Sequence, residues 1–167
     1  MAKIHQQQNG FTLIELMIVL IILGVLSAIS LPIFQNYVAK SQLTRAVYEI
    51  SSTKASIDTI LSQGGYPTVD PDQDRQNYPN GSIYEYIGLN GNNPTSNIVS
   101  LATITNNNNA FGGLEATLGG DVSTVLTGTI IRLTRNPING TWQCQIVLPP
   151  NTSTLNLNVN GCNFVQS

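Results

Sequence analysis

Phe11 to Phe34 reads FTLIELMIVLIILGVLSAISLPIF, an apolar stretch that contains one charged residue, Glu15. About 20 apolar residues are enough for a helix to cross a bilayer, so the stretch predicts a membrane-spanning helix. A charged side chain in hydrocarbon costs roughly 2.5–3.5 kcal/mol on insertion scales. Nothing else in the stretch is expected to supply a compensating partner, and Glu15 therefore predicts a partner from outside it.

A short polar leader, MAKIHQQQNG, precedes the apolar stretch; it carries Lys3 but no acid and ends at Gly10. Cleavage between Gly10 and Phe11 would create an α-amino group four residues from Glu15. A neighbouring copy of the chain would then be able to offer its amine to this carboxylate. An assembly would thus satisfy a charge that a single chain leaves unpaired.

The run Gly10-Phe11-Thr12-Leu13-Ile14-Glu15 resembles the prepilin cleavage motif of type IV pilins, and the short leader is similar to that of the type IVa subclass. The resemblance implies cleavage after Gly10 by a prepilin peptidase, N-methylation of Phe11, and pairing of Glu15 with a neighbour's amine during subunit assembly. It also implies a prepilin in the inner membrane. Pilus machinery and minor pilins would then build the chain into an extracellular fimbrium.

An ordinary secretory signal peptide is the alternative explanation of the amino-terminal segment. Ala28-Ile29-Ser30 offers small residues at a cleavage position that follows an apolar region. Glu15 inside that region, and the Gly10–Phe11 junction before it, favour prepilin processing instead. Lys3 ahead of the apolar run favours a cytoplasmic amino terminus.

Gly24 and Pro32 are weak points in the expected helix. Proline removes a backbone hydrogen bond, and glycine costs about 1 kcal/mol of helix propensity. In type IV pilins the matching residues bracket a stretch that can extend when subunits pack in a filament, and the resemblance implies the same here. A kinked membrane helix is the alternative.

The second half of the expected helix, residues 35–62, is amphipathic, and a continuous helix from Phe11 to Leu61 would be roughly 75 Å long. Arg45–Glu49 and Lys54–Asp58 have the spacing of i,i+4 ion pairs. Gly64-Gly65 predicts the end of the helix. The apolar stripe of this half consists of Leu43, Val47, Ile50, Ile57 and Leu61.

The rest of the chain predicts a connecting loop over residues 63–97, with a short helix or strand near Ile83–Ile87, and a sheet over 98–167. The fold class is therefore α+β, a long helix packed on an antiparallel sheet. Glycine pairs and asparagine runs, including Gly112-Gly113 and Asn106–Asn109, predict breaks between strands. The expected strands are Ile98–Thr105, Leu114–Leu118, Thr129–Arg135, Thr141–Leu148 and Leu155–Val159.

Two cysteines, Cys144 and Cys162, stand near the end of a chain that the leader predicts to be exported, where a disulfide can form. Trp142 would share a strand face with Cys144 and is interpreted as a core residue. The placement of the cysteines resembles the disulfide-bounded C-terminal region of type IV pilins. Ser167 resembles a serine that carries an O-glycan in some members.

Composition argues against catalysis and against nucleic-acid binding as a main activity. Charged residues make up 10% of the 167 residues, and the net charge of −2 gives no basic footprint. The only histidine, His5, lies in the leader. Catalytic triads and histidine metal sites are therefore not expected after processing, and neither an enzyme nor a cofactor is predicted.

Asp70, Asp72 and Asp74 imitate the start of a calcium loop. Arg75 and Gly81 stand where an EF-hand requires glycine and glutamate, respectively, so we interpret the segment as a solvated turn without a metal.

These patterns predict a structural subunit that polymerises with copies of itself into a filament. The resemblance implies adhesion, twitching motility or DNA uptake as the use of that filament, with host surfaces or DNA as possible partners. A minor pilin or a pseudopilin of a secretion system would share the same amino-terminal motif and remains the alternative. A signal-anchored hydrolase is the enzymatic alternative, and the sequence offers it no catalytic grouping.

Overall fold

The computed structural model describes the chain in three ranges, residues 10–107, 110–150 and 157–166. The expected leader before Gly10 and the expected glycan site Ser167 lie outside these ranges. The chain divides into two units, residues 1–37 and 38–167, which share one long helix.

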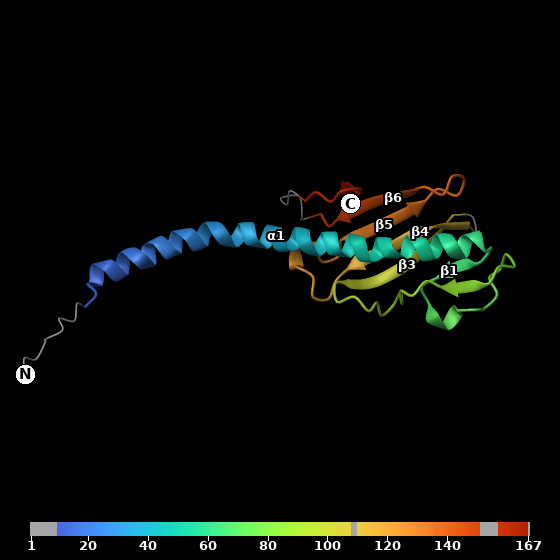
Figure 1. Ribbon diagram of the computed structural model, residues 1–167, viewed down its shortest axis with the longest axis horizontal. Coiled ribbons are helices and arrows are strands. Elements are labelled where there is room, and N and C mark those ends of the chain that lie inside the picture. Colours follow the sequence, from blue (N-terminus) through green and yellow to red (C-terminus); the bar gives the residue numbers. More distant parts are fainter. Residues whose placement is uncertain (1–9, 108–109, 151–156, 167) are drawn as a thin grey trace, which may run out of the picture. The chain divides into compact units, whose positions relative to one another are not determined.

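The long helix α1 spans Leu13–Ser62 and has 50 residues, as the sequence predicted (Figure 1). In the described ranges the elements after α1 are β1 (Tyr66–Thr68), the 3-10 helix η1 (Pro71–Gln73), β2 (Tyr84–Tyr86), β3 (Val99–Asn107), β4 (Ala110–Leu118), the 3-10 helix η2 (Thr124–Leu126), β5 (Ile130–Arg135), β6 (Trp142–Leu148) and β7 (Asn163–Gln166). The fold is therefore α+β, with one helix ahead of a strand-rich second half.

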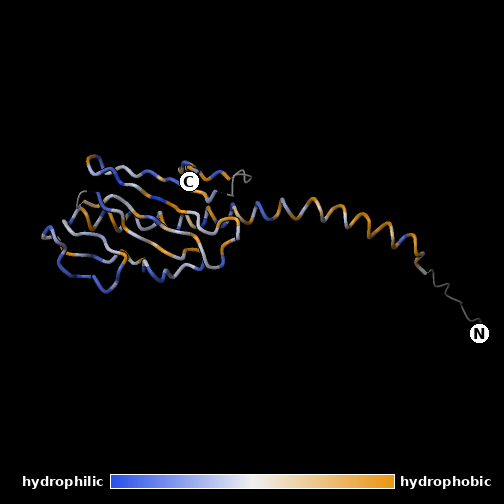
Figure 2. Tube along the Cα trace, turned by 180° about the vertical axis from the view of Figure 1, so that it is seen from behind, coloured by the Kyte–Doolittle hydropathy of each residue, from blue (hydrophilic) through white to orange (hydrophobic). Residues whose placement is uncertain are grey.

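The described residues do not bury any of the large apolar side chains in the first half of α1. From Phe11 to Phe34 every large hydrophobic side chain is at least 50% exposed, and Figure 2 shows this half as an almost continuous hydrophobic coil. Within the described ranges, α1 is the helix that is long and apolar enough to cross a membrane. Pro32 lies inside α1, and the helix continues past it.

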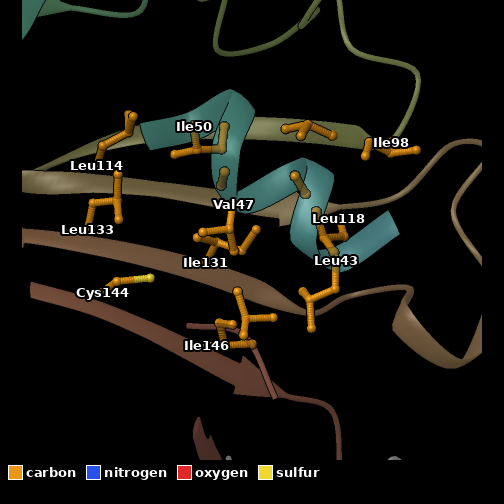
Figure 3. Packing of buried hydrophobic residues seen from close by; sticks show 14 of the residues in the cluster. Leu43, Val47, Ile50, Ile98, Leu114, Leu118, Ile131, Leu133, Cys144 and Ile146 are labelled. Atoms are coloured by element: carbon orange, nitrogen blue, oxygen red, sulfur yellow. The ribbon is translucent and has the colours of Figure 1, made fainter. Parts of the chain in front are cut away.

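The second half of α1 packs one face on the sheet. Figure 3 shows Leu43, Val47 and Ile50 pointing toward side chains of the strands, among them Ile131 and Ile146. The predicted stripe is confirmed for Leu43, Val47, Ile50 and Ile57, all buried, while Leu61 is only partly buried because Ile60 occupies the inner face at that turn.

The end of α1 has the geometry that Gly64-Gly65 predicted. Gly64 adopts a φ of 80°, in the left-handed region that glycine enters without strain. The N–H of Gly65 donates to the carbonyl of Ile60 at 3.0 Å, and the N–H of Gly64 donates to that of Leu61 at 3.2 Å. These two bonds form a Schellman cap, which satisfies carbonyls that the helix end would otherwise leave unpaired.

The main sheet has the strand order β3-β4-β5-β6-β7. The strands from β3 to β6 pair antiparallel, as expected, and Leu114 of β4 lies opposite Leu133 of β5. Residues on β5 and β6 alternate, so that Ile131, Leu133 and Ile146 are buried against α1. The hydrophobic core therefore lies between one face of this sheet and the second half of α1.

Three expectations about strands are wrong. The asparagine run does not end β3 at Thr105, because β3 continues through Asn106 to Asn107. β4 continues through Gly112-Gly113 without a break. A Cβ atom at Gly113 would lie 2.1 Å from the carbonyl oxygen of Leu133 on the paired strand, so the strand has room only for glycine at this position. Here glycine permits a close approach of two backbones instead of marking a turn. The described residues of the strand expected at Leu155–Val159 form no strand.

The last strand, β7, instead follows Cys162 and pairs parallel with β6, which departs from the expected antiparallel meander. Leu157 and Val159 are nevertheless buried. Their alternation therefore indicated burial correctly and strand pairing incorrectly.

Residues 66–97 are more ordered than the loop that the sequence predicted. β1 and β2 form a parallel pair, and β2 falls within the expected Ile83–Ile87 segment. Tyr66 and Tyr78 stack with 3.9 Å between ring centroids, and Tyr84 meets both edge-on. Burial is the main cause that raises the pKa of the Tyr66 phenol above its usual range, and a side-chain hydrogen bond with Tyr78 is the second.

Candidate functional site

The junction between Gly10 and Phe11 is exposed at the start of α1. A methyl group added at Gly10 would meet nothing within 4 Å, and Phe11 is 92% exposed. Contacts among the described residues therefore do not require either residue type. From the side of the described chain, the junction is open for another molecule to approach the backbone.

Glu15 has a partner that sequence reasoning missed. The backbone N–H of Thr12 donates to its Oε2 at 2.9 Å, and the Thr12 hydroxyl donates to the same oxygen at 2.7 Å. The N–H of Glu15 in turn donates to the Thr12 hydroxyl at 3.3 Å. This reciprocal arrangement is a capping box, and the spacing Thr-x-x-Glu was a readable signal for it.

The expectation that nothing in the stretch partners Glu15 is therefore wrong for hydrogen bonds. It holds for charge: the ion pairs among the described residues use Arg45, Arg132 and Arg135 as cations, and Glu15 belongs to none of them. Phe11, Leu16, Ile18 and Val19 line a shallow apolar hollow beside Glu15. The carboxylate thus combines satisfied hydrogen bonds, an unneutralised charge and apolar surroundings.

The second unit carries the disulfide. Cys144 of β6 is joined to Cys162, which lies 18 positions later in the sequence, and their Cα atoms are 4.5 Å apart. The bond ties the segment ahead of β7 to the middle of β6. In the chain-entropy model, closing a loop of this size stabilises the folded state by about 3 kcal/mol.

Asp58 of α1 is the polar connection between the helix and the sheet. Arg135 donates through Nε to Oδ1 at 2.7 Å, and the Trp142 indole N–H donates to Oδ2 at 3.0 Å. The expected Lys54–Asp58 pair is therefore replaced by two partners from β5 and β6. Trp142 is partly buried and packs against the core, and the Lys54 ammonium lies 6.0 Å from its ring centroid.

The other predicted ion pair, Arg45–Glu49, is present at 2.7 Å. The acidic run forms a turn, in which the Asp70 carboxylate accepts from the Asp72 N–H at the start of η1. Asp74 accepts from the N–H of Tyr86. The described residues contain no group of three or more side chains suited to hold a metal ion.

Comparison with known proteins identifies the class of the chain. Residues 39–160 match the family described as "Pilin (bacterial filament)", and residues 5–31 match the prokaryotic N-terminal methylation motif. The chain belongs to the pilin family, and its fold is the pilin fold.

Relatives place it among the type IV pilins. The chain is 44% identical over 140 residues to the fimbrial protein EcpB of Eikenella corrodens, covering 84% of this chain and 86% of that one. It is 36% identical over 144 residues to a type IV major alpha-pilin of Moraxella bovis, covering 83% and 86% of the two chains. A fimbrial protein of Pseudomonas aeruginosa is 35% identical over 143 residues, which cover 86% and 88%.

Proposed function

We propose that the chain is a structural subunit of type IV pili, synthesised as a membrane-anchored prepilin and polymerised through the first half of α1. The observation that carries the proposal is the exposed apolar helix half with one capped but unneutralised carboxylate, Glu15. The family match and the relatives named as major pilins support the major subunit over a minor pilin or a pseudopilin. They also support a structural protein over an enzyme.

Processing would supply the missing cation. A prepilin peptidase would cleave after Gly10, where the open backbone admits a protease, and would methylate Phe11. The new amine carries a positive charge beside the amino-terminal end of α1. In the filament it would pair with Glu15 of a neighbour inside a bundle of apolar helices. Gly24 and Pro32 would let the helix between them extend during packing.

The proposed division of the chain follows the same plan. Residues 11–34 would cross the inner membrane and later form the filament core, and residues 35–62 would carry the sheet. The surface of the pilus would present the 63–97 connection and the sheet over 98–167, including the disulfide-bounded region. Adhesion, twitching motility and DNA uptake are the uses that we propose for the fibre.

Mass spectrometry of fibres sheared from cells tests this proposal. The mature chain should begin with methylated Phe11, and the Gly10→Val variant should remain uncleaved in the membrane and give no fibres. A mature chain that begins at Leu31 would establish the signal-peptide alternative and end the proposal. Intact mass of the same sample reports whether Ser167 carries a glycan.

A further inference from the structure

A groove in the second unit gathers both lysines that follow the leader. It has a volume of about 380 Å³ and lies between α1 and the segment that precedes β7. Lys40 and Lys54 line it, and the described residues of its lining include no acid. The rest of the described lining is Thr44, Val47, Tyr48, Ser51, Cys144, Asn158, Val159, Asn160, Gly161 and Cys162.

The charges of these two lysines are not neutralised by the acids of the same helix. Glu49 pairs with Arg45 and accepts from the Ser96 hydroxyl at 2.6 Å. The Asp58 carboxylate accepts hydrogen bonds from Arg135 and Trp142. No ion pair among the described residues includes Lys40 or Lys54. The groove therefore presents two positive charges to whatever enters it.

An acidic loop lies at the other edge of the sheet. Residues 66–97 contain four acids, Asp70, Asp72, Asp74 and Glu85, against one cation, Arg75. Two backbone-to-carboxylate bonds, to Asp70 and to Asp74, hold the loop in a fixed conformation. Asp72 is exposed at its tip, and none of these acids forms an ion pair among the described residues.

The two features lie on opposite sides of the second unit. The loop is tied to β3 through Gly91, which donates to Val69 and accepts from Ala102. The groove lies beside β7, at the far end of the strand order. Figure 1 shows the same separation, with the short helix after β1 below the sheet and the carboxyl-terminal segment above it.

We infer that the acidic loop at Asp70–Asp74 of one subunit docks in the Lys40–Lys54 groove of the next subunit in the polymer. The inference rests on the proposed function, because it needs a second copy of the chain. Two different complementary surfaces on opposite edges make a heterologous contact, which repeats without closing and builds an open helical array. A two-fold dimer would require a self-complementary surface instead.

The contact would set the register of neighbouring sheets more than the cohesion of the fibre. Exposed ion pairs are individually weak, and salt screens them over about 8 Å at physiological ionic strength. The apolar helices would hold the fibre together. The loop and the groove would select one rotation between neighbours and add a small, salt-screened stabilisation, so added salt should lower the fibre yield only modestly.

Carbodiimide cross-linking of native fibres tests the contact directly, because the reagent joins an amine to a carboxylate only where the two touch. Wild-type fibres should give a ladder of covalent oligomers, in which peptides containing Lys40 or Lys54 are joined to the Asp70–Asp74 peptide. Fibres of the Lys40→Arg, Lys54→Arg variant keep both charges and should assemble, but without joined peptides between this part of α1 and the Asp70–Asp74 loop. If the peptides that contain Lys40 or Lys54 are joined only to peptides without Asp70, Asp72 and Asp74, the inference is overturned.

Exchanging the charges of the two surfaces is a second test of the docking contact. Lys40→Glu alone and Asp72→Lys alone should each lower the yield of sheared fibres by about threefold to fivefold, the range expected for an exposed pair. Their combination should restore the yield. The matched control is Ser56→Glu with Gln63→Glu, which adds two negative charges at exposed positions outside the groove and should leave the yield unchanged.

Each other result has a defined meaning. Single variants without effect, or a combination that fails to restore the yield, would overturn the inference. If Lys40→Glu lowers only the retention of a labelled DNA duplex on fibres, the groove binds an outside polyanion and the docking contact is overturned. If the wild-type chain gives no fibres, the proposed function itself fails, and the two failures are thereby distinguished.

Discussion

The two halves of α1 have the same backbone and opposite relations to the rest of the chain. Between Phe11 and Phe34 the large apolar side chains are all at least half exposed, whereas Leu43, Ile50 and Ile57 are at most 1% exposed. The second half is completed by the sheet of its own chain, and the first half has no such cover among the described residues. One helix therefore joins a folded unit to a segment whose apolar surface needs lipid or other subunits.

The largest effect expected is that of Glu15→Leu on assembly. The change removes the cost of a charge in the membrane, so insertion and cleavage should persist. The neighbour's amine would then enter an apolar bundle unpaired, and breaking one side of a buried pair costs about 3–5 kcal/mol. Electron microscopy should find few or no fibres, and fibres at wild-type levels would refute the neutralisation of Glu15. Thermal unfolding of the second unit should not change.

The buried half of α1 should respond in the opposite way. Leu43→Ala removes a fully buried side chain and should lower the free energy of unfolding by about 2–5 kcal/mol. The matched control is Ile18→Ala, a side chain 51% exposed, which should leave that free energy unchanged. Chemical denaturation in detergent micelles measures both, and equal destabilisation by the two variants would contradict the division of α1 into two halves.

Loss of the disulfide should damage the sheet and spare the membrane segment. Cys144→Ser with Cys162→Ser should lower the free energy of unfolding by about 3 kcal/mol, because the unfolded chain gains the freedom that the bond removes. Fibre yield should fall through proteolysis, while membrane insertion continues. Thiol alkylation of native fibres without reduction should label neither cysteine, and labelling of both would refute the bond.

The smallest effect expected concerns Asp58. Asp58→Asn keeps the size of the side chain but removes the charge that accepts from Arg135 and Trp142, and should cost about 1–2 kcal/mol because the site is partly solvent-exposed. The fluorescence of Trp142, the only tryptophan, reports the change. Glu49→Gln weakens the ion pair with Arg45 and the hydrogen bond from Ser96, neither of which reaches a strand of the main sheet, and it should cost less. A larger loss for Glu49→Gln would mean that Asp58 does not join helix to sheet.

Local patterns predicted the parts of the fold that depend on neighbours in sequence. The stripe from Leu43 to Ile57 and the stop at Gly64 follow from helical periodicity and from the conformational freedom of glycine. Gly113 was misread because its role depends on the distance to Leu133 on another strand. The pairing of β7 with β6 is likewise a tertiary choice, and alternating apolar residues do not specify it.

The candidate site was also predicted in part. Glu15 is the only charge in its stretch, which marks it as a candidate, whereas its capping role depends on Thr12 three positions earlier, a residue that also belongs to the cleavage motif. The partners of Asp58 lie 77 and 84 positions away, beyond any spacing rule for one helix. Chemistry that depends on distant residues therefore required the fold.

The capping box at Thr12 and Glu15 has a consequence both for the addition of subunits to a fibre and for their release from it. A carboxylate with no hydrogen bonds would gain so much from its first cation that joining a fibre would be nearly irreversible. Here two Thr12 donors already stabilise the carboxylate in the single chain, so the proposed pairing with a neighbour's amine would add less than it would to an uncapped carboxylate. We therefore expect a subunit released from a shortened fibre to regain a stable resting form in the membrane and to be used again.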